Sequence, residues 1–290
     1  MAKPAKDIAA SVRARLFNLS REREQDFQRV LVSYGLERLL YRLSISEHKD
    51  RYILKGGMLV TLWTIDPGRF TQDIDFLAFG HDDAERLLAN FKEVLAQEVD
   101  DGLIFDLEEM SAAPIRDDQV YGGMRLKTTA YLKKTKIPIV IDLGFGDAII
   151  GPDYEIEYGS LLDMPSATVR AYSPETVIAE KFQAVIALGI VNSRMKDYYD
   201  LYSIPRSVHV SDEALVKAIQ STFERRETEI PLARPSGLTP EFTQDLIRET
   251  QWAAYSAGTD VADMSLKEIS DDIWARLKAI CKSAKEREAH

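Results

Sequence analysis

The chain of 290 residues contains a single cysteine, Cys281. One cysteine excludes an intrachain disulfide framework and a metal site built from thiolates. No apolar run approaches the roughly 18 residues expected of a membrane helix, and no apolar segment follows the first positive charges as in a secretory signal. Histidines are few and too scattered in sequence to predict a histidine metal site: His48, His81, His209 and His290. We therefore expect a cytoplasmic protein without a membrane partner.

Two common catalytic patterns are also missing. The sequence has no Gly-x-Ser-x-Gly elbow and no Walker-type loop, which argues against a serine hydrolase and a P-loop ATPase. A content of 45% hydrophobic and 29% charged residues is typical of a globular chain with one large or two modest cores. The net charge of −10 argues at first against a nucleic-acid partner. The acidic excess lies within 51–200, however, where bound cations would offset part of it, so charge alone does not decide whether RNA binds.

Two aspartates in the segment 69–79 are the most informative feature that is present. Asp73 and Asp75 are two residues apart, and because a strand alternates its side chains, both should point to the same side while Ile74 and Phe76 point to the other. Neighbouring carboxylates repel and raise each other's pKa. A hard divalent metal ion is the simplest way to hold them together. The alternative is that both acids point into solvent from an edge strand.

The pattern of the chain changes twice along its length. Helix-like spacing over 5–46 predicts an N-terminal helical segment. The helical pattern returns from Ser173 onward, where Ser173 is the expected N-cap and Pro174 occupies the first helical position. Between them, the sequence predicts strands, a Gly-Gly turn, a short helix through Met58–Trp63 and a second helix over 82–99. We expect an α+β fold with three parts, namely a helical segment 1–50, a core 51–172 and a helical C-terminal domain 173–290. Predicted strands in the core are 103–110, 122–132 and 137–145, and predicted helices are 82–99, 174–188, 194–203, 211–226, 239–257 and 265–283.

Two further features of the predicted core could act together with the acids. Gly56 and Gly57 follow a short strand and precede a helix, so their backbone N–H groups could approach a phosphate, although an ordinary strand-to-helix turn would look the same. Asp142 directly follows the segment 137–141, which is apolar at every position and suits a strand covered on both faces. A buried carboxylate there needs a partner or a cation. If this strand lies beside the strand of Asp73, three carboxylates converge.

A lysine in the predicted helix 174–188 also requires a partner. Lys181 shares a stripe with aliphatic residues spaced by four, so it should either meet an anion or extend past the edge of the core. In the predicted helix 194–203, Asp197 and Asp200 lie on one face, and Lys196 precedes Asp200 by four residues. Either acid could hold either lysine. The neighbouring tyrosines could stack on a base, but packing in the core is the more ordinary role.

In combination, these motifs resemble a known family. Leu54-Lys-Gly-Gly57, Arg69-Phe-Thr-Gln-Asp-Ile-Asp-Phe76, Ile141-Asp142, Ala179-Glu-Lys-Phe182 and Lys196-Asp-Tyr-Tyr-Asp-Leu201 occur in the order seen in nucleotidyltransferase toxins of the AbiEii/AbiGii type, from abortive-infection and toxin–antitoxin systems. The similar region covers 52–202. The resemblance implies a polymerase-β-like nucleotidyltransferase core, with a mixed sheet and flanking helices, followed by a helical C-terminal part. Met58 and Gln72 depart from residues common in the family, but neither is a proposed metal ligand.

The resemblance also implies roles for individual residues. Two Mg²⁺ ions bound by Asp73, Asp75 and Asp142 would orient an NTP, and Asp142 could help deprotonate the attacking hydroxyl. Lys181 would neutralise phosphate charge, with Asp200 orienting it or contacting the nucleotide. The acceptor would be an RNA 3′ end such as that of tRNA, and a cognate antitoxin would be a second partner. The expected nucleotide-binding residues are Gly56, Gly57, Arg69, Thr71, Lys181 and Lys196.

Two other functions are compatible with these residues. A metal-dependent phosphodiesterase or nuclease could use the same acids, but it would not need a glycine turn for a triphosphate. A catalytically silent protein could use the same core to bind an RNA or an antitoxin. Shortening of RNA without added NTP would favour the nuclease, and tolerance of Asp-to-Asn changes would favour the silent protein.

Overall fold

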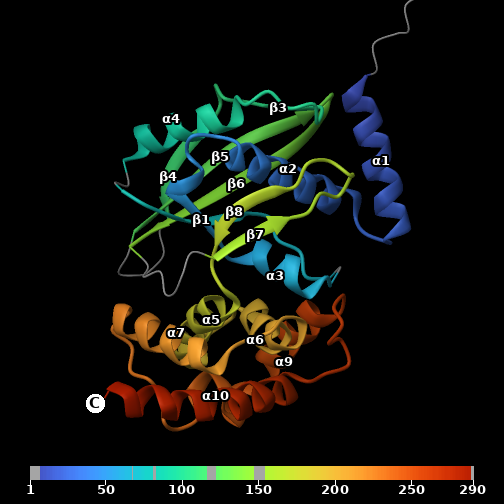
Figure 1. The fold of residues 1–290 in the computed structure, drawn as a ribbon. Helices are drawn as coiled ribbons and strands as arrows, with labels where there is room; N and C mark the ends of the chain where they lie inside the picture. Colours follow the sequence, from blue (N-terminus) through green and yellow to red (C-terminus); the bar gives the residue numbers. More distant parts are fainter. Residues whose placement is uncertain (1–6, 67, 81–82, 116–121, 147–153, 289–290) are drawn as a thin grey trace, which may run out of the picture. The chain divides into compact units, whose positions relative to one another are not determined.

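The computed structural model describes residues 7–66, 68–80, 83–115, 122–146 and 154–288. The chain divides into two compact units. The first comprises Met1–Met58, Phe70–Gly146 and Asp153–Ala171, and the second comprises Leu59–Arg69, Asp147–Pro152 and Tyr172–His290. All described strands belong to the first unit, whereas the described part of the second is helical (Figure 1).

The described strands of the first unit form one mixed sheet. Its order is β3-β5-β6-β2-β1-β8-β7, and β4 pairs with β5 outside this path. The pairs β2–β6 and β1–β8 are parallel, and the other pairs are antiparallel. This arrangement confirms the predicted α+β class. The strands are β1 (Tyr52–Lys55), β2 (Ile74–Ala78), β3 (Leu103–Phe105), β4 (Ser111–Ile115), β5 (Gly123–Leu132), β6 (Thr135–Phe145), β7 (Tyr154–Tyr158) and β8 (Ala167–Ala171).

Strand β6 shows which face of the sheet is buried. Its residues at 137, 139, 141 and 143 are fully buried, whereas Pro138 is exposed and Val140 and Asp142 are half-buried. The expectation that both faces of this strand are covered is therefore wrong. The sequence is apolar on both faces, but antiparallel pairing with β5 allows one face to stay partly open to solvent.

Helix α2 (Phe27–Ser44) covers the buried face of the sheet. A Cβ added at Gly35 would lie 2.8 Å from Cδ1 of Ile139, so the glycine permits the close approach of helix and sheet. The predicted helical segment 5–46 is divided in two, because Glu24 has a positive φ of 52° and Asp26 caps α2. The other described helices that begin in this unit are α1 (Ile8–Glu22), η1 (Lys49–Arg51), α3 (Gly57–Thr64) and α4 (Ala84–Leu95).

The second unit is built from the C-terminal helices. Helix α5 (Pro174–Leu188) has the predicted bounds, with Ser173 as its N-cap and Gly189 at φ 52° after its end. The predicted helix 239–257 is two helices, because Asp245 begins a new one with its own cap. The remaining described helices are η2 (Gly189–Val191), α6 (Met195–Ser207), α7 (Asp212–Arg225), η3 (Ser236–Leu238), α8 (Pro240–Thr243), α9 (Leu246–Ser256) and α10 (Leu266–Glu288).

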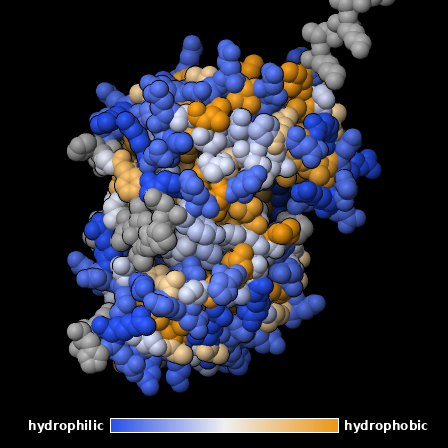
Figure 2. All heavy atoms as spheres, in the orientation of Figure 1, coloured by the Kyte–Doolittle hydropathy of each residue, from blue (hydrophilic) through white to orange (hydrophobic). Residues whose placement is uncertain are grey.

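The face of the protein shown in Figure 2 is largely hydrophilic, as the content of 29% charged residues leads us to expect. Hydrophobic residues lie on this face in small groups. Among the described helices, none combines the length and the apolar content that crossing a lipid bilayer would require.

Candidate active site

The three predicted acids lie at neighbouring positions of the first unit. Asp75 on β2 and Asp142 on β6 are direct partners in the parallel pair of these strands. Asp73 immediately precedes β2, and the Thr71 hydroxyl donates to its Oδ1 at 2.8 Å. All three carboxylates are half-buried on the less covered side of the sheet. The predicted adjacency of the strands of Asp73 and Asp142 is therefore confirmed.

An arginine that the sequence did not reveal belongs to the same group. Arg125 on β5 is the antiparallel partner of Asp142. Its Nε donates to Asp142 Oδ1 at 2.7 Å and its Nη2 donates to Oδ2 at 2.6 Å, so the guanidinium holds both carboxylate oxygens. The hydrogen bonds to Asp142 chiefly raise the pKa of Arg125, and the charges of Asp73 and Asp75 raise it further. One guanidinium thus compensates part of the charge of all three acids.

The Gly-Gly turn borders Asp75 directly. Gly56 has φ 71°, and a Cβ added there would lie 2.0 Å from Asp75 Oδ2, so any side chain would displace the carboxylate. The Gly57 N–H at the start of α3 donates to the same oxygen at 3.4 Å. The turn and the acid therefore form one compact structure.

A lysine on the strand before the turn also lies near the acids. Lys55 is the partner of Asp75 in the antiparallel pair β1–β2. A Cβ added at Gly144 on β6 would lie 3.2 Å from the Lys55 ammonium nitrogen, so this side chain extends over β6. Lys55 belongs to the motif Leu54-Lys-Gly-Gly57, and the sequence alone indicates no role for it.

The chemistry of the acids suits a hard divalent ion, because three carboxylates from adjoining segments offer only oxygen ligands. The space beside Asp75 is preserved by a glycine whose Cβ would fill it. Among the described residues, no three acidic, histidine or cysteine side chains are arranged as a ready metal centre. In this arrangement Arg125 occupies both oxygens of Asp142.

Lys181 and Asp200 belong to a buried ionic network in the second unit. The Lys181 ammonium lies 2.9 Å from Asp197 Oδ1 and 2.6 Å from Asp200 Oδ2. Arg69 binds Asp200 with both prongs of its guanidinium, at 2.7 Å from Nε to Oδ1 and 2.9 Å from Nη2 to Oδ2. Asp200 is fully buried. The anion that Lys181 was expected to require is thus supplied within the protein.

In this network the opposite charges of the partners outweigh the cost of burying each ionised group. Burial opposes the charge of Lys181, but Asp197 and Asp200 outweigh it and raise the pKa of the lysine. Burial likewise opposes the charge of Asp200, but Lys181 and Arg69 outweigh it and lower the pKa of the carboxyl. Arg69 is therefore a partner of Asp200 in this structure. Its expected contact with a nucleotide stays a prediction.

The remaining predicted residues lie on α6. Lys196 is exposed, whereas Tyr198 and Tyr199 are completely buried, which confirms packing in the core as the role of these two rings. The Tyr198 hydroxyl donates to the Gly237 carbonyl at 2.8 Å, and the Tyr199 hydroxyl donates to Asp66 Oδ2 at 2.5 Å. Neither tyrosine is available for stacking on a base in this structure.

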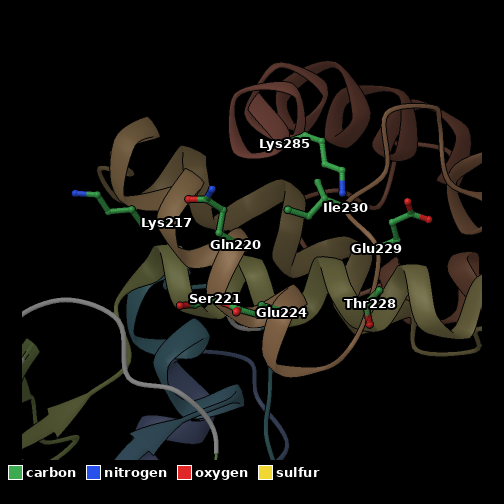
Figure 3. A pocket seen from close by; sticks show the side chains of 8 residues that line it. All are labelled: Lys217, Gln220, Ser221, Glu224, Thr228, Glu229, Ile230 and Lys285. Atoms are coloured by element: carbon green, nitrogen blue, oxygen red, sulfur yellow. The ribbon is translucent and has the colours of Figure 1, made fainter. Parts of the chain in front are cut away.

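A separate hollow lies in the second unit, with a volume of about 670 Å³. Its walls come from α7, from the segment that follows α7 and from Lys285 of α10 (Figure 3). None of the predicted site residues, all of which are described, lines it. The lining residues are Lys217, Gln220, Ser221, Glu224, Thr228, Glu229, Ile230 and Lys285.

A comparison with protein families identifies the class. The sequence pattern of the nucleotidyl transferase AbiEii toxins, which act in type IV toxin–antitoxin systems, matches residues 38–278 of this chain. The chain is therefore a nucleotidyltransferase of toxin–antitoxin type. It belongs to the AbiEii toxin family, which confirms the resemblance drawn from its motifs.

Comparisons with single proteins add little to this. A candidate nucleotidyltransferase from H. pylori is 17% identical, with a TM-score of 0.47, and the match covers 88% of this chain and 96% of that one. The structure of JHP933 from Helicobacter pylori is 16% identical, with a TM-score of 0.48 and coverage of 89% and 95%. The comparison with curated proteins found no match. At these values the two structures support no statement about function.

Proposed function

We propose that the chain transfers a nucleoside monophosphate from an NTP to the 3′ hydroxyl of an RNA such as tRNA, with Asp73, Asp75 and Asp142 as ligands of two Mg²⁺ ions. Membership of the AbiEii family supports nucleotidyl transfer. The observation that carries the assignment of residues is the in-register pairing of Asp75 with Asp142 beside the turn at Gly56. A carboxylate group next to an open backbone turn suits a metal-bound triphosphate.

The protein groups would divide the work by their chemistry. Bound Mg²⁺ would supply positive charge that stabilises the transferred phosphoryl group and the leaving pyrophosphate. The turn at Gly56 and Gly57 carries no side chains, so a phosphate could approach the N-terminus of α3, where an anion is favoured by the helix dipole. Thr71 fixes Asp73 through its hydrogen bond and so positions the carboxylate.

The proposed reaction exchanges a phosphoanhydride bond of the NTP for a new phosphodiester bond to the acceptor. The acceptor oxygen forms a bond to the α-phosphorus, the bond from that phosphorus to pyrophosphate breaks, and the hydroxyl proton leaves. Asp142 is the proposed acceptor of this proton, and its two oxygens also accept hydrogen bonds from Arg125. The proposed action of Lys181 and Lys196 on the phosphates remains a prediction, with Asp200 as the residue that positions Lys181.

Incubation with each labelled NTP, Mg²⁺ and total RNA tests the proposal. Wild-type protein should label RNA with one or more of the NTPs, and Asp73→Asn should abolish the labelling. Asp163→Asn is the matched control, because the side chain of Asp163 is fully exposed. Absence of transfer by the wild type, or equal transfer by Asp73→Asn, would refute the enzyme assignment. RNA that shortens without added NTP would instead support a nuclease.

The family also implies a partner protein. A toxin of this type is expected to have a cognate antitoxin, and co-expression with the product of a neighbouring gene tests whether growth inhibition by the toxin is relieved. If only toxin variants that label RNA inhibit growth, and the antitoxin relieves that inhibition, then toxicity results from nucleotidyl transfer. Inhibition by the Asp73→Asn variant would separate toxicity from nucleotidyl transfer.

A further inference from the structure

The pair between Arg125 and Asp142 is a two-pronged ion pair at the group of acids. The guanidinium Nε donates to Asp142 Oδ1 at 2.7 Å, and its Nη2 donates to Oδ2 at 2.6 Å. The strand register fixes the two residues opposite each other, because β5 and β6 pair directly at these positions. The strand pairing therefore holds the backbones of the two residues next to each other.

The same carboxylate is the third acid of the proposed metal group. A guanidinium that holds both oxygens in a planar fork uses one lone pair on each and occupies the position between them at which a chelated cation would bind. Asp142 therefore cannot chelate a divalent ion with both oxygens while Arg125 keeps its fork, and the charge of an ion bound to either oxygen would repel the guanidinium.

We propose that Arg125 is a built-in competitor of the divalent ion for Asp142, so that metal binding requires the guanidinium to release the carboxylate. This inference rests on the proposed function, because it takes Asp142 as a metal ligand. It assigns Arg125 as a positioning residue that sets the metal affinity and keeps the acids compact when no metal is bound.

The exposure of the two side chains indicates which of them has room to leave the pair. The side chain of Asp142 is 14% exposed, whereas that of Arg125 is 40% exposed. Arginine has a long side chain with several rotatable bonds, so it can leave the pair without movement of β5, whereas the short Asp142 side chain stays with β6. A released guanidinium remains beside the site, where its five donors suit phosphate oxygens.

Direct titration with Mn²⁺ alone, by calorimetry and by the loss of the free-ion electron paramagnetic resonance signal, tests the competition without any reaction. Arg125→Met should bind Mn²⁺ on the order of tenfold more tightly than wild type, because the ion no longer has to displace two charge-assisted hydrogen bonds from Asp142. Arg125→Lys, which keeps the charge without the fork, should fall between them. Asp142→Asn should bind more weakly, and adding Arg125→Met to it should produce no gain.

Lys127→Met is the matched control for simple loss of positive charge. Lys127 lies on the same strand two residues from Arg125, on the same side, and is exposed opposite Val140. Its replacement should change Mn²⁺ affinity by much less than that of Arg125. An equal gain in the two variants would show a general electrostatic effect and would overturn the proposal.

Thermal unfolding gives a second measurement that does not use activity. Arg125→Met should lower the melting temperature in EDTA, because Asp142 loses its partner, and saturating Mn²⁺ should reduce this difference. Equal or weaker Mn²⁺ binding by Arg125→Met would overturn the inference and leave nucleotidyl transfer intact. Absence of Mn²⁺ binding by every variant would overturn both the inference and the proposed metal ligands.

Discussion

Asp75 and Asp142 occupy directly opposed positions on the parallel strands β2 and β6, so two negative charges from distant parts of the chain meet at one point of the sheet. Such a pair is costly unless positive charge is placed beside it. The protein supplies that charge from Arg125, which holds Asp142 with two hydrogen bonds. Because repulsion between carboxylates opposes folding, we expect the closeness of Asp75 and Asp142 to serve function more than stability.

The first prediction therefore separates activity from stability at Asp75. Asp75→Asn should reduce nucleotidyl transfer at least about 100-fold, because a metal ligand contributes several kcal/mol to stabilising the transition state. The same change should leave the melting temperature in EDTA unchanged or higher, because it removes repulsion between carboxylates. Transfer rates and thermal unfolding of one preparation measure both effects. A large fall in melting temperature would show that Asp75 has a structural role.

The second prediction concerns the glycine turn. Gly56→Ala should abolish NTP-dependent labelling and weaken Mn²⁺ binding, because the added Cβ would overlap Asp75 Oδ2 at 2.0 Å. A positive φ adds about 1 kcal/mol of strain for alanine. Gly80→Ala is the control for strain alone, because Gly80 has φ 104° and open space around its Cβ position. If both variants lose stability but keep activity, the turn does not shape the site.

The sequence predicted best where local chemistry decides the structure. The bounds of α5 followed from the Ser173 cap and Pro174, and both act within one helical turn. Lys181 required an anion because of its aliphatic stripe, and Asp197 and Asp200 of the next helix supply it. Asp142 was predicted to need a partner for a similar reason. In each case the residue's own neighbours in sequence contained the signal.

The sequence could not show what depends on strand register. Arg125 lies on an alternating strand and looks like any exposed arginine until β5 and β6 are paired, which places it opposite Asp142. A shift of one residue would send it to the other face of the sheet. Arg69 is a second case. The sequence did not show its pairing with Asp200, because the two residues are 131 positions apart in the chain. Such pairings follow from tertiary structure alone.

The third prediction concerns the buried ionic network of the second unit. Asp200→Asn should lower the free energy of unfolding by about 3–5 kcal/mol, because Lys181 and Arg69 would lose a fully buried partner. Asp272→Asn removes a surface pair with Arg206 and should cost less than about 1 kcal/mol. Urea unfolding of both variants gives the comparison. Similar small losses would show that the network is not coupled to folding.

The last prediction follows from the lowered pKa of Asp200, whose burial is outweighed by Lys181 and Arg69. Because the folded pKa lies below the unfolded value of about 3.9, the stabilisation is complete above that pH and is lost as the pH falls through the folded pKa. The difference in unfolding free energy between wild type and Asp200→Asn should therefore be constant near neutral pH. It should shrink below about pH 4, where the carboxyl is protonated in the unfolded chain, and vanish once the pH is below the lowered folded pKa and the folded carboxyl is protonated as well. Urea unfolding between about pH 7 and pH 2.5 measures this difference, and Asp272→Asn serves as the surface control. A difference that stays constant down to the lowest pH at which the protein folds would show that the charge of Asp200 is not what stabilises the network.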